Sequence, residues 1–424
     1  MAEREPDADK VIRIKPKMRP VEAIHYKQEG QDMFLLRDPL HYSESQLHVS
    51  PDVFVIASLF DGEHDFEAIK NEFSTRFGAK VTDENIQRVK QAMEEAHLLD
   101  GPAFEEWRQG IEDAYHDQPE RGPILAGNCY PEDDREVGAY LDKYFTADGG
   151  PGKPQERKPD AKPLRGLVVP HIDLRRGGVS FAHAYKALWE AKPPETVVVL
   201  GVAHASKGGL LCFTKKAFRT PLGTVAVDDA LVDRLAAKAH EPYADEFAHK
   251  GEHSIEIQTI WLQHIGGSNV PRIAPILTGS LRECIEDDRP PRDVRGLTAF
   301  VEELGNVIKE SQGRVLVIAS VDLAHIGQKF GDEVPLTPRL LRKNRELDRK
   351  MLEIIADGDP DEFFEFVRQE EDRRKICGLT PIYLLLSALR HAGGKTATGA
   401  LLHHDQSPEE ETQSLVSYAA LSYP

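Results

Sequence analysis

Three short apolar runs in this chain lack the 3.6-residue period of an amphipathic helix. They span residues 167–170, 197–200 and 315–318 and are rich in valine, leucine and isoleucine. Such runs are typical of strands buried on both faces of a parallel sheet. Each run is followed within a few residues by a histidine, namely His171, His204 and His325. Ligands of open α/β sheets bind outside the carboxyl ends of the strands, so these strand ends are the predicted position of a functional site. The alternative is that the three histidines are ordinary loop residues with satisfied hydrogen bonds.

Strand-like and helix-like segments alternate around these runs, which predicts an α/β domain with a mainly parallel sheet covered by helices on both faces. The first expected strand ends at residue 170, and three more span 196–201, 272–277 and 314–320. The expected helices span 134–145, 181–191 and 297–309.

The region from about Asp32 to Leu99 has the pattern of a small separate unit. Two strands are expected at 34–36 and 46–49, followed by three short helices. The apolar stripe of the second helix consists of Phe66, Ile69, Phe73 and Phe77, and that of the third helix consists of Ile86, Val89 and Met93. Two strands and three amphipathic helices of this length predict an α+β unit of the winged-helix type.

A polar segment between Tyr115 and Pro123 is the predicted junction between two domains, 1–115 and 122–424. A chain of 424 residues is long enough for two cores that fold independently. The second polar stretch, 149–163, is expected to be a surface loop, because the helix before it needs a partner for its apolar face.

The composition of the chain, and its net charge above all, excludes some classes of binding partner. The chain has 71 acidic and 53 basic residues, and its formal charge of −18 repels nucleic acid and anionic lipid. The first ten residues lack the apolar core of a signal peptide, and no apolar run reaches the length of about 18 residues that a membrane helix needs. We therefore expect no nucleic-acid or membrane partner and a cytoplasmic location. The four cysteines form no C-x-x-C pair and are expected to be free thiols in a reducing compartment.

Asp322 and His325 form an Asp-x-x-His pair after the third apolar run. A carboxylate beside an imidazole orients the ring and raises its basicity, which suits general acid–base catalysis. Glu252, His253 and Glu256 form a second concentration, which is predicted to lie on one helix that continues to Ile265. The two acids could position a ligand near His253, or they could stand at the helix start because negative charge complements the helix dipole.

Cys377 is followed by Gly378, Leu379, Thr380 and Pro381, which is typical of a helix entrance. Backbone N–H groups at such an entrance favour the thiolate, which is a nucleophile or a soft metal ligand. The alternative is a buried, inert thiol.

Seven motifs in order make the chain resemble the Memo family, whose bacterial and archaeal members are called AmmeMemoRadiSam system protein B. The motifs are Ala126-Gly127-Asn128-Cys129-Tyr130-Pro131, Pro170-His171, Leu200-Gly201-x-x-His204, Glu252-His253-Ser254-Ile255-Glu256, Ser320-x-Asp322-x-x-His325-x-Gly327, Cys377-Gly378 and Val416-Ser417-Tyr418-Ala419-Ala420. The resemblance covers the chain from Ala126 to the C-terminus.

This resemblance implies a fold like that of class III extradiol dioxygenases and a metal held by His171, His204 and Cys377. The catalytic groups lining the pocket would be Asp322, His325 and His253. Two imidazoles and one thiolate favour Fe(II) or Cu, with Zn as a further candidate, over Mg or Ca. Three protein ligands leave a position for dioxygen, water or substrate, although two histidines and a cysteine also occur in electron-transfer copper sites.

The chain departs from its relatives beside the implied ligands. Many relatives read Pro-His-Ala-Gly-Tyr where this chain has Ile172-Asp173-Leu174 after His171, and Arg175 follows. Leu379 and Thr380 stand where relatives often have Arg and His. We therefore predict a substrate-binding set of its own, namely Glu252, Glu256, Asp173 and Arg175.

The leading hypothesis is a metal-dependent redox enzyme that uses dioxygen. The resemblance adds radical-SAM and AmmeMemoRadiSam system protein A-like partner proteins. A module that binds a peptide or a phosphorylated ligand without turnover is one alternative, and a metal-dependent hydrolase is another, because the same side chains could activate water.

The N-terminal unit resembles the PqqD-like family of peptide-binding domains. The pattern that carries this resemblance is Leu59-Phe60-Asp61-Gly62, Phe66-x-x-Ile69 and a last helix ending at Leu98-Leu99. It implies a peptide ligand for this unit. The alternative is a winged-helix fold that has no binding partner.

Overall fold

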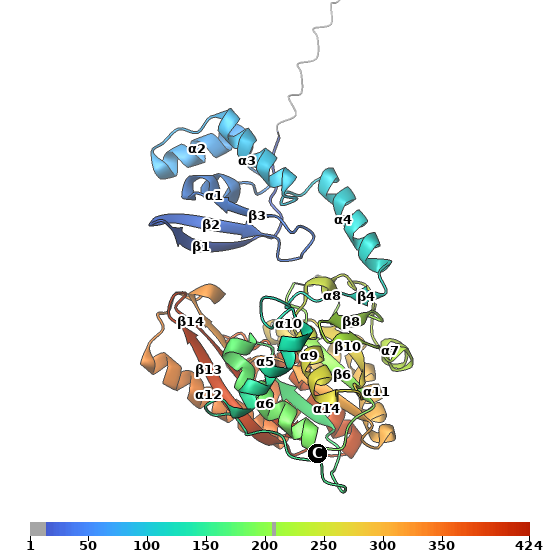
Figure 1. Cartoon of the computed structure of the whole chain (residues 1–424). Helices are drawn as coiled ribbons and strands as arrows, with labels where there is room; N and C mark the ends of the chain where they lie inside the picture. Colours follow the sequence, from blue (N-terminus) through green and yellow to red (C-terminus); the bar gives the residue numbers. More distant parts are fainter. Residues whose placement is uncertain (1–13, 206–208) are drawn as a thin grey trace, which may run out of the picture. The chain divides into compact units, whose positions relative to one another are not determined.

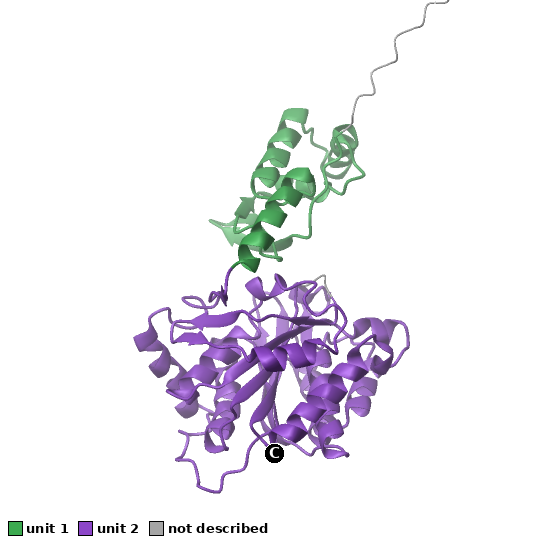
Figure 2. Ribbon diagram, turned by 90° about the vertical axis from the view of Figure 1, so that its right-hand side faces the viewer, with its two compact units in different colours: residues 1–117 green, residues 118–424 purple. Residues whose placement is uncertain are grey.

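The computed structural model describes residues 14–205 and 209–424. The chain divides into two compact units, residues 1–117 and 118–424 (Figure 2), and the division falls inside the polar segment predicted as a junction. The first ten residues, expected to lack a signal peptide, lie outside the described residues. Within the described ranges, no helix has the length and apolar character needed to cross a membrane.

The first unit is an α+β domain with its own core. Its elements are β1 (Glu22–Gln28), β2 (Gln31–Arg37), β3 (Gln46–Val49), α1 (Pro51–Ser58), α2 (Phe66–Phe77), α3 (Asp83–Glu95) and α4 (Pro102–His116). The strands form an antiparallel sheet in the order β1-β2-β3. Local sequence fixes both middle helices, because Asp65 and Thr82 cap the N-termini of α2 and α3 with their side chains. The winged-helix and PqqD-like interpretations stay predictions.

The apolar stripe predicted for α2 is correct at two positions and wrong at its end. Ile69 and Phe73 are buried in the core of the first unit, whereas Phe77 is 54% exposed. Phe77 is the last residue of the helix, and Gly78 turns the chain away in the left-handed conformation. A periodic stripe is buried only as far as its helix has a packing partner.

The second unit is an α/β domain built on a large mixed sheet (Figure 1), and a smaller sheet has the order β4-β8-β9. Its strands are β4 (Glu120–Arg121), β5 (Gly166–Val169), β6 (Thr196–Val202), β7 (Leu211–Phe213), β8 (Ala217–Thr220), β9 (Gly223–Val225), β10 (Arg272–Thr278), β11 (Val315–Ser320), β12 (His325–Gly327), β13 (Ala400–Glu409) and β14 (Ser414–Tyr423). Its helices are α5 (Asp134–Thr146), α6 (Leu174–Glu190), α7 (Asp229–Ala236), α8 (Ala248–Gly251), α9 (Glu256–Gly266), α10 (Arg282–Glu286), η1 (Pro291–Asp293), α11 (Leu297–Ser311), η2 (Gln328–Phe330), α12 (Pro338–Asp357), α13 (Pro360–Gln369) and α14 (Leu379–Gly393).

The large sheet has the order β12-β14-β5-β11-β6-β10-β7, and β13 pairs with β14. The four central strands β5, β11, β6 and β10 are parallel, as the alternating pattern predicts. The sheet as a whole is not mainly parallel, because β14, β12, β13 and β7 add antiparallel pairs at both sides. β13 and β14 form a local hairpin, whereas the pairings of β7 with β10, of β12 with β14 and of β14 with β5 join residues far apart in the sequence, so no local pattern gives their direction.

Alternate residues of the central strands face two separate helical layers. Val198 and Leu200 of β6 pack with residues of α7, α11 and α14, whereas Val197 and Val199 pack with residues of α5, α6 and α9. This arrangement explains why the strands read as continuous apolar runs, since both faces are buried. It also brings the carboxyl ends of β5, β11 and β6 side by side.

Two predicted helix boundaries need correction. The helix expected at 181–191 begins at Leu174, because Asp173 caps its N-terminus by accepting a hydrogen bond from the backbone N–H of Arg175. The helix expected to carry both Glu252 and Glu256 begins at Glu256. Glu252 lies before it and accepts a hydrogen bond from the backbone N–H of Ser254, an arrangement that competes with helix formation.

Candidate metal centre

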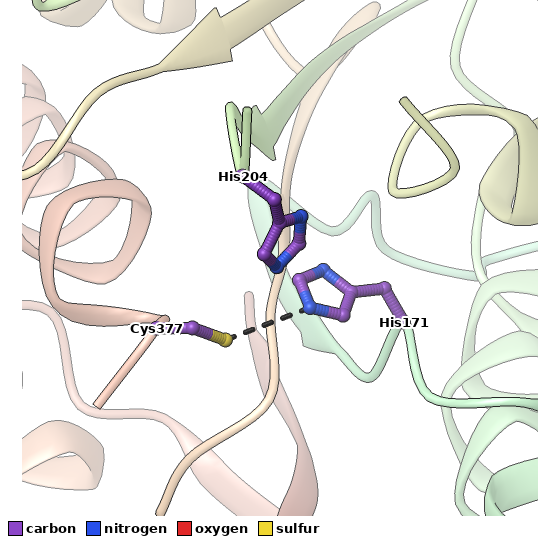
Figure 3. A group of neighbouring side chains, drawn as sticks. All are labelled: His171, His204 and Cys377. Atoms are coloured by element: carbon purple, nitrogen blue, oxygen red, sulfur yellow. Dashed lines mark hydrogen bonds between the residues drawn. The ribbon is translucent and has the colours of Figure 1, made fainter. Parts of the chain in front are cut away.

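Three sequence-distant segments bring His171, His204 and Cys377 together (Figure 3). His171 follows β5 and His204 follows β6, and each stands just beyond the carboxyl end of its strand. Cys377 precedes α14, whose N-cap is Gly378. One nitrogen of each histidine and the sulfur of the cysteine all lie within 4.8 Å of one another. The convergence expected from the strand ends and from the family resemblance is therefore present in the fold.

The separation of two of these atoms fits a shared metal ion. Nε2 of His171 lies 3.5 Å from Sγ of Cys377. A metal binds histidine nitrogen at about 2.0 Å and cysteine sulfur at about 2.3 Å, so two such ligands of a tetrahedral ion lie about 3.5 Å apart. The rings of His171 and His204 are 5.0 Å apart and inclined at 69°.

A backbone carbonyl fixes the tautomer of His171. Nδ1 of this buried ring lies 3.0 Å from the carbonyl oxygen of Ser320, at the end of β11. Because the carbonyl can only accept, Nδ1 carries the proton and the lone pair is on Nε2, which faces Cys377. Burial, followed by the neighbouring His204 and His253, holds the pKa of His171 well below its usual value, so the ring stays neutral.

Glu252 connects two imidazoles at the centre. Its Oε2 lies 2.9 Å from Nδ1 of His204, and its Oε1 lies 3.1 Å from Nδ1 of His253. Burial alone would raise the pKa of Glu252, but the two histidines outweigh it and hold the pKa well below its usual value. An ionised Glu252 therefore keeps protons on both Nδ1 atoms and leaves Nε2 of His204 with its lone pair.

The centre is open on one side. The side chain of His171 is 2% exposed, whereas those of His204 and His253 are 38% and 36% exposed. His253 lies 5.1 Å from His171 and from His204, ring to ring. Burial acts to lower the pKa of His253, but Glu252 outweighs it and the pKa is raised, so this imidazole is suited to accept and donate a proton.

Two backbone groups of Asp322 surround the sulfur of Cys377. The N–H of Asp322 points to Sγ at 3.3 Å, and the carbonyl of the same residue lies 3.3 Å from it. Burial, followed by the charge of Asp322, raises the pKa of the Cys377 thiol well above its usual value. Burial therefore opposes the thiolate that the helix entrance was expected to favour.

Asp322 and His325 make separate contacts near the centre. Oδ1 of Asp322 accepts hydrogen bonds from the N–H groups of His171 and Ile172, and Oδ2 lies 3.7 Å from Nε2 of His171. Burial raises the pKa of Asp322 to about 6. Nδ1 of His325 bonds to the carbonyl of Leu323, its ring meets Phe330 edge-on, and burial lowers its pKa to about 4.

A cavity of about 570 Å³ adjoins His204. Its volume is that of a small-molecule pocket. It is lined by Ala203, His204, Gly209, Leu210, Gly279, Ser280, Leu281, Arg282, Glu283, Cys284, Glu286, Arg289 and Val294.

Glu256 was expected to bind substrate, but it is engaged inside the protein. Both its oxygens accept hydrogen bonds, from the side chains of Arg121 and Tyr130 and from the N–H groups of Ile124 and Leu125. The side chains of Arg121 and Glu256 are 1% and 0% exposed. This arrangement favours a structural role for Glu256. It also shows that the end of the predicted junction belongs to the second unit, because Arg121 lies in β4.

Asp173 and Arg175, also expected to bind substrate, pair with each other over 2.6 Å at the start of α6. Asp173 is the helix cap, which accounts for its position without a substrate. The Arg175 side chain is 69% exposed.

Sequence reasoning gave no role to Gln258, which holds the two segments that position His171. Its Nε2 donates to the carbonyl of Pro170 and to Oγ of Ser320, both at 2.7 Å. Tyr185 in turn donates to Oε1 of Gln258 at 2.8 Å. Gln258 follows the motif that contains Glu252 and His253. A polar residue at a buried position of the otherwise apolar helix α9 was the signal that could have indicated this supporting role.

Comparison with known proteins identifies the family of the second unit. Residues 121–422 match the family model described as Memo-like protein. A MEMO1 family protein of Aquifex aeolicus is 29% identical over 97% of this chain and 100% of its own length. MEMO1 family proteins of Methanopyrus kandleri and Thermococcus kodakarensis are 31% and 32% identical over 72% of this chain and 99% of their own lengths. The alignment with the Aquifex protein therefore extends through the N-terminal unit.

Proposed function

The chain belongs to the Memo-like protein family, and from that membership we propose that it is a metal-dependent oxidoreductase. One transition metal ion would be held by His171, His204 and Cys377. A set of two imidazoles and one thiolate excludes Mg and Ca by ligand preference and suits Fe(II) or Cu, with Zn as the redox-inactive competitor.

The observation that carries the proposal is the pairing of Nε2 of His171 with Sγ of Cys377 at 3.5 Å. Independent hydrogen bonds support it. The carbonyl of Ser320 and the carboxylate of Glu252 accept from Nδ1 of His171 and of His204, so the Nε2 lone pairs of both rings stay free for a cation. The partly buried thiol of Cys377, which lies near the carboxylate of Asp322, would gain a compensating positive charge when a cation binds.

A bound iron or copper ion would supply one-electron redox chemistry at a coordination position that three protein ligands leave free. His253 would move protons, since Glu252 holds its Nδ1 and leaves Nε2 as the exchanging atom. The carboxylate of Asp322 would hold His171 in place by accepting a hydrogen bond from the backbone N–H of His171. The cavity beside His204 would admit a small substrate. Dioxygen is the proposed oxidant, as the resemblance to extradiol dioxygenases implies.

Metal analysis of the full chain, purified without oxygen, tests the proposal. We expect about one iron or copper per chain in the wild type and loss of the metal in His171→Ala and Cys377→Ala. The matched control is Glu353→Gln, whose side chain is 69% exposed. Binding of nitric oxide to the Fe(II) form, followed by electron paramagnetic resonance, tests for the free coordination position. A wild-type chain that holds neither iron nor copper after reconstitution would contradict the proposal.

A metal-dependent hydrolase is the second candidate, because Glu252 and His253 form a carboxylate–imidazole pair that could activate water. Stoichiometric zinc, together with hydrolysis of an activated ester that is lost in His253→Gln, would favour it over the oxidoreductase.

For partners, we propose radical-SAM and AmmeMemoRadiSam system protein A-like proteins, and a peptide ligand for the N-terminal unit. These follow from the resemblances. The archaeal relatives align with about the length of the second unit, which supports a separate role for the first. Co-purification of the full chain with the candidate proteins, compared with a chain of residues 118–424, tests this.

A further inference from the structure

The segment that leads into Cys377 has an unusual backbone. Residues 370–376 connect α13 to Cys377, and three of them adopt the left-handed conformation, namely Glu371, Asp372 and Lys375, with φ of 53°, 47° and 50°. None is a glycine, so each position is disfavoured and is maintained only where the surroundings hold it. Such strain is commonly found at functional sites.

One buried arginine holds this segment. The side chain of Arg374 is 7% exposed and contacts residues of α12. It pairs with Asp348 at 2.5 Å, with Glu370 at 2.8 Å and with Oδ1 of Asn344 at 3.2 Å. Asp348 is fully buried and also lies 3.2 Å from Nε2 of His404 on β13. The planar guanidinium therefore connects the segment to α12 and, through Asp348, to β13.

The backbone of the same segment contacts the metal centre. The carbonyl of Arg374 accepts a hydrogen bond of 2.7 Å from the N–H of His325, at the start of β12. Asp372 accepts a 2.8 Å hydrogen bond from the N–H of Ile376, the residue before Cys377. The segment that precedes Cys377 is therefore held by the buried ion pair of Arg374, by the bond to His325 and by the turn that Asp372 closes.

We propose that Arg374 is a positioning residue that sets Sγ of Cys377 against Nε2 of His171 by clamping the strained segment to Asp348. This inference rests on the proposed metal centre. Without the clamp, the left-handed residues would relax toward ordinary backbone conformations, and the sulfur would move relative to the two histidines. A weaker and altered metal–thiolate bond is the expected consequence.

Cobalt(II) binding to the full chain is the test, since the thiolate-to-cobalt charge-transfer band reports directly on Cys377. In Arg374→Gln, the cobalt affinity should fall about 10–100-fold, as for other residues that orient metal ligands, and the band per bound cobalt should decrease. Arg374→Lys should restore part of the cobalt affinity and part of the band intensity, because lysine retains a positive charge that can pair with Asp348. The matched control is Arg373→Gln, an adjacent arginine that is 76% exposed and should leave both unchanged.

Thermal unfolding of the metal-free variants shows whether they fold. If Arg374→Gln does not fold, Glu370→Gln replaces it, because Glu370 is partly exposed and its isosteric exchange removes only one charged partner. About threefold weaker binding in that variant would support the role. The proposed role of Arg374 would be overturned if Arg374→Gln folds and binds cobalt with the affinity and the charge-transfer band of the wild type. The same result in Glu370→Gln, where that variant replaces it, would also overturn the role. A wild-type chain without the band would instead contradict the metal centre.

Discussion

Glu252 and His204 are joined by a hydrogen bond of 2.9 Å between Oε2 and Nδ1, and the second oxygen of the same carboxylate lies 3.1 Å from Nδ1 of His253. One buried carboxylate therefore sets the tautomers of two imidazoles. One of them is a proposed metal ligand, and the other is the proposed proton carrier. Substitution of Glu252 should disturb metal binding and proton transfer together.

Glu252→Gln should weaken metal binding about 10–100-fold, because an amide cannot accept from both imidazoles through two oxygens. Titration of the metal-free chain against a competing chelator measures this. Glu353→Gln, on the exposed surface, should bind the metal as the wild type does. Equal affinities for Glu252→Gln and the wild type would show that Glu252 does not orient His204.

Four variants separate ligands from acid–base groups. His171→Ala and Cys377→Ala should lose the bound metal. Asp322→Asn and His325→Ala should retain it, and turnover, once a substrate is known, should fall about 10²–10⁴-fold as expected for general acid–base groups. The measurement is the metal content of the four purified proteins. Equal metal loss in all four would make Asp322 or His325 a ligand.

Glu256 should be a structural residue. Removal of one partner from a buried ion pair typically lowers the free energy of unfolding by about 3–5 kcal/mol, because the other charge remains buried. Glu256→Gln should therefore melt at a markedly lower temperature than the wild type. Arg135→Gln is the control, since the Arg135 side chain is 83% exposed and its loss should leave the melting temperature unchanged. A Glu256→Gln variant with normal stability and impaired turnover would support the substrate-binding role instead.

His249 should make the second unit sensitive to acid. Its side chain is buried, Nε2 bonds to the carbonyl of Cys212, and its Nδ1 has no hydrogen-bond partner among the described residues. Burial lowers the pKa of His249 to about 3. The unfolded chain therefore takes up this proton at higher pH than the folded one. The contribution of His249 to stability is complete above about pH 6.5 and is lost as the pH falls from there toward 3.

Urea unfolding measures this contribution. Between pH 6.5 and 5 the wild type should lose about 1.5 kcal/mol more unfolding free energy than His249→Gln, which cannot take up the proton. His116→Gln, at an 80% exposed position, should keep the wild-type dependence. Parallel pH profiles for the wild type and His249→Gln would contradict the prediction.

Local sequence determined the elements that build the centre. The apolar runs gave β5, β6 and β11 because a strand buried on both faces must be apolar at every position. Parallel strands must end at one edge of the sheet, so the positions of His171 and His204 followed from the order of the chain. Helix caps such as Asp65 and Thr82 are likewise local signals. The family resemblance supplied Cys377 as a ligand, which no local pattern distinguishes from a buried thiol.

Tertiary structure alone decided how the polar groups are shared. Glu252 and Glu256 look equivalent in the sequence, yet one contacts His204 and the other contacts Arg121, a partner 135 residues away. The antiparallel direction of β14 depends on its pairing with β5, a neighbour in the sheet that lies far earlier in the chain. Buried carboxylates take whichever cation or donor the fold places beside them, because leaving them unpaired in a low dielectric is costly. That choice is made by packing across the whole domain, and a periodicity of two or of 3.6 residues carries no record of it.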